Sequence, residues 1–228
     1  MLPATSSVST RISSKRLAVS IFRISLQHND TYAFRQRPVI TRNQEVYQDI
    51  VPDMSGSFVG GASRCEWCEE LLSKWDESLR GVVIKQRKHD LSVTYDGVLI
   101  ASERFVAAYT ANGLSGMVFR RLPDDSCFFA VRAVRAIEFD SVRRKTRFID
   151  RCQYCGNYES VVGAVPVFLR AGSEVGEREI VRTDLVFGSG DEKHPLLICG
   201  SSAASIIASA SLKGVDLIPI EEDGGSGG

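Results

Sequence analysis

Two Cys-x-x-Cys motifs, separated by 83 residues, constrain this chain more than any other feature of its sequence. They are Cys65-Glu-Trp-Cys68 and Cys152-Gln-Tyr-Cys155. The two sulfurs of such a turn can reach one metal ion, and two turns supply the four thiolates that close a tetrahedral zinc site with no position left for water. Because the intervening segment is far longer than in a compact zinc ribbon, a shared ion would join two distant parts of the chain. The sequence therefore predicts one structural Zn²⁺ bound by Cys65, Cys68, Cys152 and Cys155.

Other interpretations of the cysteines stay open at this point. The chain has six cysteines and no recognisable secretory signal, and in a reducing compartment paired motifs indicate metal or redox chemistry rather than disulfides. A redox dithiol is one alternative, because Cys68 lies near the predicted start of a helix; unmetallated thiols or a disulfide are the others. Cys127 and Cys199 are predicted to be small buried core residues. Arg64 and Arg151 each precede a motif, where a guanidinium would offset the −2 charge of a zinc tetrathiolate.

The composition is that of an ordinary globular protein, with 43% hydrophobic residues and 28 basic residues balanced by 28 acidic ones. A protein that neutralises many phosphates usually carries a basic excess, so nucleic acid is an unlikely partner. No apolar run approaches the roughly 20 residues needed to cross a bilayer. We therefore expect a soluble, cytoplasmic protein without a membrane partner.

Hydrophobic periodicity gives a coarse map of the secondary structure. Leu71, Leu72, Trp75 and Leu79 recur at helical spacing and predict a helix that follows the first motif and stops near Gly81. The segment 54–63 is expected to be a loop. Strands are predicted at 19–26, 38–41, 82–85, 91–95, 126–134, 136–139 and 161–169.

Two segments, 98–122 and 196–220, have the same pattern of a strand, a helix, a Leu-x-Gly tripeptide and a second strand. In the first, Ser102 is the predicted helix N-cap and Asn112-Gly113 the stop. Aligned without a gap, four of the 25 positions are identical, and one Cys-x-x-Cys motif lies upstream of each segment. The sequence thus predicts an α+β fold of mixed sheets with few helices, in which internally duplicated β-α-β units are joined by a four-cysteine zinc site.

This duplication suggests how the chain is divided. The first 29 residues contain no acid, which is typical of a disordered leader; an organellar transit peptide or a wrongly assigned start codon would also explain it. The predicted parts are a leader at 1–18, a first half at 19–140, a second half at 141–222 and a flexible tail at 223–228.

No catalytic motif accompanies the cysteines. His28, His89 and His194 are expected in separate polar loops at the surface, and the chain has no nucleophile elbow, His-Glu-x-x-His motif or phosphate loop. A closed four-cysteine site offers no catalytic water, so we predict no enzyme activity. The basic run at 143–147 is expected to be a solvated strand face, with an RNA-binding patch as the alternative.

The order of several short motifs resembles a known family. They are Ile21-Phe22-Arg23-Ile24, Cys152-Gln-Tyr-Cys155-Gly156, Asp184-Leu185-Val186-Phe187, Leu196–Gly200 and Leu212-Lys213-Gly214-Val215, with Ser102-Glu103-Arg104-Phe105 and Gly113-Leu114-Ser115-Gly116 in the earlier unit. In this order the chain is similar to the double-CXXCG-motif proteins of myxobacteria. It departs from their pattern at Glu69, which stands where the first motif of the family has Gly, so a left-handed turn residue is not expected there.

Some members of that family serve as immunity proteins against toxins exchanged between neighbouring bacterial cells. The resemblance implies a zinc-binding, non-catalytic protein that binds and neutralises a cognate toxin. Glu66, Glu69, Glu70, Asp191 and Glu192 are candidate contacts, because acidic inhibitors often oppose basic nuclease clefts. The alternative is a zinc-dependent nucleic-acid-binding or regulatory module. The sequence predicts neither the toxin nor the oligomeric state.

Overall fold

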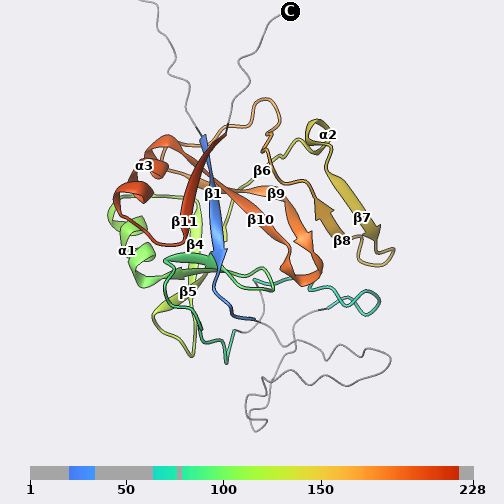
Figure 1. The fold of residues 1–228 in the computed structure, drawn as a ribbon, viewed down its shortest axis with the longest axis horizontal. Coiled ribbons are helices and arrows are strands. Elements are labelled where there is room, and N and C mark those ends of the chain that lie inside the picture. The colour runs from blue at the N-terminus through green and yellow to red at the C-terminus, as the bar shows by residue number, and fades with distance from the viewer. Residues whose placement is uncertain (1–20, 34–63, 76–78, 221–228) are drawn as a thin grey trace, which may run out of the picture.

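The computed structural model describes residues 21–33, 64–75 and 79–220 (Figure 1). The predicted leader at 1–18, strand at 38–41, loop at 54–63 and tail at 223–228 lie outside the described residues. The division into halves at residue 140 stays a prediction.

The described chain is mostly strand with few helices, which confirms the α+β mixed-sheet class. Its strands are β1 Ile21–His28, β2 Leu91–Val93, β3 Leu99–Ser102, β4 Met117–Arg121, β5 Phe128–Ala133, β6 Ala136–Ile137, β7 Arg147–Arg151, β8 Tyr158–Val162, β9 Ile180–Ser189, β10 His194–Gly200 and β11 Val215–Ile220. Its helices are α1 Glu103–Ala111, α2 Ser141–Arg144 and α3 Ser201–Ser209, and a 3-10 turn, η1, spans Gly190–Glu192. None of the helices in this part of the chain is long and apolar enough to cross a membrane.

The strands form one mixed sheet in which β1 is the central junction. The hydrogen-bonded order is β4-β5-β3-β2-β1-β10-β9-β8-β7, while β11 also pairs with β1 and β6 with β9. β1 is antiparallel to β10 through Ile21–Ile24 and to β11 through Ile21–Leu26, and it is parallel to β2 at Gln27 and His28. β1 therefore connects the strands of the second predicted repeat unit to β2, which lies just before the first unit in the chain.

Both segments predicted to be repeats have the expected strand–helix–strand order, and their strands pair in the same way. β3 and β4 both pair with β5, and β10 and β11 both pair with β1. The strand order β4-β5-β3-β2 thus has the same arrangement as β11-β1-β10-β9. A common origin of the two units by duplication stays a prediction.

Local signals explain the first of these units. The Ser102 hydroxyl accepts a hydrogen bond of 3.2 Å from the Phe105 amide, which caps α1 as predicted. The helix ends at Ala111 with Asn112 as its C-cap, and Gly113 follows with φ +61°, a conformation that glycine adopts without strain. Phe105 and Tyr109 point into the core, and the Tyr109 hydroxyl accepts a 2.9 Å hydrogen bond from the Met117 amide.

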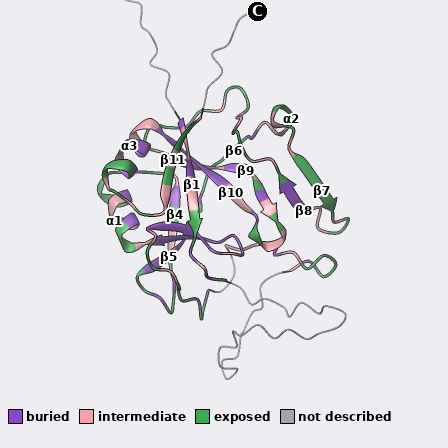
Figure 2. Cartoon of the chain, viewed as in Figure 1, coloured by how far each residue is buried: buried purple, intermediate pink, exposed green. Residues whose placement is uncertain are grey.

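β3 and β10, near the middle of the sheet, are buried on both faces, whereas β7 at its edge is exposed (Figure 2). Successive side chains of a strand point to opposite faces, so burial of consecutive residues shows that both faces are covered there. Leu99 and Ala101 pack with α1 and α3 in one shared core, while Ile100 faces a second cluster under residues 79–84. α1 and α3 lie together on one side of the sheet (Figure 1). Cys199 is fully buried, as predicted, whereas Cys127 is exposed and its predicted core position is wrong.

The predicted helix after the first Cys-x-x-Cys motif is also wrong. Residues 71–75 and 79 are not helical, and Leu71 instead forms an isolated β-bridge with Arg64. The Lys74 ammonium donates a 2.7 Å hydrogen bond to the backbone oxygen of Lys193, 119 residues away. Contacts with distant backbone therefore override the local helical spacing of apolar residues.

Three further predictions need correction. Residues 82–85 form no strand, because the Ile84 amide donates to the Asp125 carboxylate at 3.0 Å rather than to a neighbouring strand. The strand predicted at 161–169 ends at Val162 as part of β8. The basic run at 143–147 occupies α2, its left-handed cap Lys145 and the first residue of β7, not one strand face.

Candidate metal centre

The first Cys-x-x-Cys motif forms a tight loop closed by backbone hydrogen bonds. The Cys65 amide donates to the backbone oxygen of Glu70 at 2.9 Å, and the Glu69 amide donates to the backbone oxygen of Cys65 at 2.8 Å. The bridge between Arg64 and Leu71 closes the base of the loop. Glu69 has φ +61°, so a left-handed residue does follow this motif even though it is not glycine, contrary to the sequence-based expectation.

The second motif forms the same loop at the equivalent positions. The Cys152 amide donates to the backbone oxygen of Asn157 at 2.8 Å, and the Gly156 amide donates to the backbone oxygen of Cys152 at 3.0 Å. Arg151 and Tyr158 are paired at its base, where β7 and β8 meet. Gly156 has φ +77°. The two loops therefore share one backbone design, although they lie far apart in the sequence.

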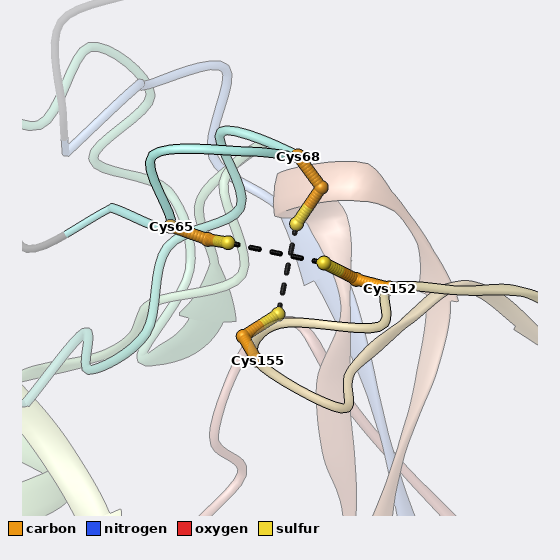
Figure 3. Close-up of side chains that lie close together, drawn as sticks. All are labelled: Cys65, Cys68, Cys152 and Cys155. Atoms are coloured by element: carbon orange, nitrogen blue, oxygen red, sulfur yellow. Dashed lines mark hydrogen bonds between the residues drawn. The ribbon is translucent and has the colours of Figure 1, made fainter.

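The loops face each other with their four sulfurs turned inward (Figure 3). The Sγ atoms of Cys65 and Cys152 are 3.9 Å apart, those of Cys68 and Cys155 are 3.6 Å apart, and all four lie within 4.8 Å of one another. A disulfide would bring two sulfurs to about 2.05 Å, so these are free thiols. Four sulfurs at about 2.3 Å from a central zinc would be about 3.8 Å apart in a tetrahedron. The structure thus brings together all four predicted ligands in an arrangement that could hold a metal ion.

Backbone amides of the loops favour thiolates at two of these positions. Hydrogen bonds from the backbone of Cys155 and Tyr154 lower the pKa of Cys152 to about 6, and the corresponding backbone groups of the first loop lower the pKa of Cys65. The pKa of Cys68 is raised to about 12, because burial and the neighbouring thiols outweigh the backbone hydrogen bond that it receives. Four adjacent thiolates repel one another, so a bound cation is what would let all four ionise together.

An aromatic pair spans the junction between the two loops. Trp67 and Tyr154 occupy the same position in their motifs, and their ring centroids are 4.3 Å apart. Trp67 is 70% exposed and Tyr154 is 66% exposed. The contact adds to the cysteines as a second link between the loops.

A buried lysine ties both loops to the sheet. The Lys193 ammonium, in a side chain only 3% exposed, lies 2.7 Å from the Glu70 carboxylate. It also donates to the backbone oxygens of Tyr158 and, at 3.1 Å, Glu159. Glu70 follows the first loop, and Tyr158 and Glu159 follow the second, so Lys193 connects the bases of both. Its own position is set by the turn between β9 and β10.

The arginine that precedes each motif donates a hydrogen bond to the backbone of its own loop. The Arg64 guanidinium donates to the backbone oxygen of Glu69 at 2.6 Å and forms an ion pair with the Asp191 carboxylate at 2.9 Å. Arg151 donates through Nε to the Gly156 oxygen at 3.2 Å. That these two guanidinium groups also offset the negative charge of a zinc tetrathiolate stays a prediction.

The acids proposed as partner contacts divide into two groups. Glu70 and Asp191 are engaged in the internal ion pairs with Lys193 and Arg64, so they serve the fold of the site. Glu66, Glu69 and Glu192 are exposed.

The histidines do not join the cysteine cluster. His28 is exposed and stacks on Tyr95 with ring centroids 5.2 Å apart. His89 and His194 are half-buried rather than at the surface, and burial is the main cause that lowers the pKa of each.

The redox alternative loses its structural basis. It depended on a helix beginning near Cys68, where an N-terminal dipole would activate a thiol, and no helix occurs among residues 64–75. Sequence reasoning missed Lys193, for which no motif gives a signal. It also missed the Trp67–Tyr154 pair, which a superposition of the two motifs would have found.

No protein-family model matches this chain, and no curated protein matches it.

Proposed function

We propose that the four cysteines bind one structural Zn²⁺ that joins the two loops. The sulfur separations of 3.6 and 3.9 Å are close to the spacing of a tetrahedral zinc tetrathiolate. The amide hydrogen bonds that lower the pKa of Cys65 and Cys152 supply the donors that such sites use to stabilise thiolates. When bound, the ion would supply cross-linking rather than chemistry, because all four positions are taken by protein ligands.

On this basis the protein acts as a cytoplasmic, non-catalytic, immunity-type protein that binds and neutralises a cognate bacterial toxin. The observation that carries this proposal is the pair of matched loops, which place Trp67 and Tyr154 at the surface beside the cysteine cluster. Exposed Trp and Tyr side chains are typical of protein-binding surfaces. The order of motifs along the chain, similar to that of the double-CXXCG-motif proteins, and the proposed duplication of the β-α-β unit support the same function.

Co-expression with a candidate toxin from a neighbouring gene tests the proposal. Cells that carry both genes should grow, and cells that carry the toxin with a Cys65→Ser/Cys152→Ser variant should not. Purified toxin should co-elute with the zinc-loaded protein. If cells die despite normal levels of soluble wild-type protein, the immunity function is wrong.

The basic segment of α2 favours a second candidate, a zinc-dependent nucleic-acid-binding module. Arg143 and Lys145 are exposed at the end of this short helix, and Arg147 begins the exposed strand β7. Retention on heparin or RNA that weakens steeply with salt would support it. Substitution of Lys145 and Arg147 by Gln should then abolish retention while leaving toxin protection intact.

A further inference from the structure

An open hollow of about 1060 Å³ lies beside the two cysteine loops. Trp67 and Tyr154 contribute the aromatic part of its lining, and Gln153 and Asn157 contribute polar groups from the second loop. The two rings, tilted by 30° to each other, are about two-thirds exposed, which is unusual for side chains of this size. Such rings bury a large area at low conformational cost when a partner covers them, which makes them strong anchors in protein interfaces.

The charges that line this hollow are mainly negative. Its acidic residues are Glu69, Glu70, Asp150, Glu159 and Asp191, and its basic residues are Arg64 and Arg151. Asp191 and Glu70 are balanced by internal ion pairs with Arg64 and Lys193. Arg151 donates to the backbone oxygen of Gly156 and keeps its positive charge. Asp150 and Glu159 are exposed. A zinc tetrathiolate would add a formal charge of −2 at the edge of the same hollow.

We propose that this hollow binds a basic segment of the partner protein, with an arginine or lysine side chain seated against the Trp67–Tyr154 rings. A cation over an aromatic face is attracted by the negative charge of the π system, and adjacent carboxylates add to that attraction. Neighbouring cationic side chains of the same segment contact Asp150 and Glu159. The same carboxylates repel phosphates, so the hollow selects against nucleic acid. This inference rests on the proposed function and names the chemistry of the toxin segment that is recognised.

The binding surface depends on the metal. Trp67 and Tyr154 lie 87 positions apart in the chain and meet because each belongs to one of the two loops whose sulfurs converge. When the cation is removed, the two loops lose the ion that would join them, and the aromatic pair loses part of what holds it together. Metal removal therefore weakens binding of the basic segment together with the stability of the site.

Fluorescence anisotropy with labelled nona-arginine tests this inference on the full, zinc-loaded chain. Trp67→Ala, Tyr154→Ala and the double variant Asp150→Asn/Glu159→Gln should each weaken peptide binding by about tenfold. Glu174→Gln removes a similarly exposed acid that does not line the hollow, so it should bind like the wild type. One equivalent of zinc in each variant shows that the loops are intact. Equal binding by the wild type and the three hollow variants, or tighter binding of an oligo-dT strand than of nona-arginine, would overturn the inference.

Failure of this inference can be distinguished from failure of the immunity function. If the wild type protects cells and Trp67→Ala/Tyr154→Ala protects them equally, the toxin binds elsewhere: the hollow proposal is wrong and the immunity function stands. If the wild type does not protect cells, the immunity function is wrong. The peptide measurement then decides separately whether the hollow binds cationic segments.

Discussion

Glu69 and Gly156 occupy the same position, directly after the second cysteine of each loop, and both have a left-handed backbone, with φ of +61° and +77°. Each donates its amide to the oxygen of the first cysteine in its loop, at 2.8 and 3.0 Å. The loop geometry therefore requires this conformation whichever residue is present. Glycine adopts it freely, whereas a residue with a side chain does so with strain.

Glu69→Gly should stabilise the protein. Relief of the left-handed strain outweighs the extra entropy of glycine in the unfolded chain, with a net gain of about 0.5–1 kcal/mol in the free energy of unfolding. Urea denaturation of the zinc-loaded protein measures the change. The matched control is Gly156→Ala, which should lose about 1 kcal/mol because it introduces the same strain. A Glu69→Gly variant less stable than the wild type would contradict the matched-loop geometry.

A bound metal should stabilise the junction between the two loops. Purified protein is expected to contain one equivalent of zinc by elemental analysis, and Cys152→Ser should lower both the zinc content and the melting temperature, since the apposed thiols lose their bridging cation. Cys127→Ser changes an exposed cysteine outside the cluster and should alter neither quantity. Far less than one equivalent of metal in the wild type, or unchanged melting of Cys152→Ser, would argue against a structural ion.

Lys193 should be essential for the attachment of both loops. Lys193→Met leaves the mostly buried Glu70 carboxylate without its 2.7 Å partner and removes the link to the carbonyls of Tyr158 and Glu159, so a loss of about 3–5 kcal/mol is expected. Thermal or urea unfolding measures it. Lys193→Met/Glu70→Gln should recover part of the loss, because the uncompensated charge is gone. If the double variant is as unstable as the sum of the single ones, the two side chains are not energetically coupled.

The sequence predicted the parts of the fold whose signals are local. Ser102 caps α1 and Gly113 follows its end as expected, because capping and left-handed turns are set by a few neighbouring residues. The helix predicted from Leu71 onward failed because Leu71 pairs with Arg64 across the loop and Lys74 binds the turn before β10. Those contacts join residues that periodicity cannot relate.

The candidate site was predictable to a similar extent. The spacing of the cysteines identified the four sulfurs, because two short turns bring each pair together wherever they lie in the fold. The hollow and the role of Lys193 were not predictable, since they depend on the turn between β9 and β10, which the sheet places beside the loops. A lysine with no motif around it gives no sign that its ammonium will be buried.

Because of Lys74, the free energy of unfolding should depend on pH in the alkaline range. Burial is the largest cause that lowers its pKa, from 10.5 to about 8, so between these values the folded chain has released a proton that the unfolded chain still binds. Stability therefore rises with pH across this window. The gain relative to Lys74→Met, which cannot titrate, should reach up to about 3 kcal/mol by pH 10.5. Urea titrations of both proteins at pH 7.5, 9 and 10.5 measure the difference. If the difference in the free energy of unfolding between the wild type and Lys74→Met stays constant, or if it shifts in favour of Lys74→Met as pH rises, Lys74 remains charged in the folded protein. The backbone oxygens of Asp191 and Lys193 would then hold the ammonium.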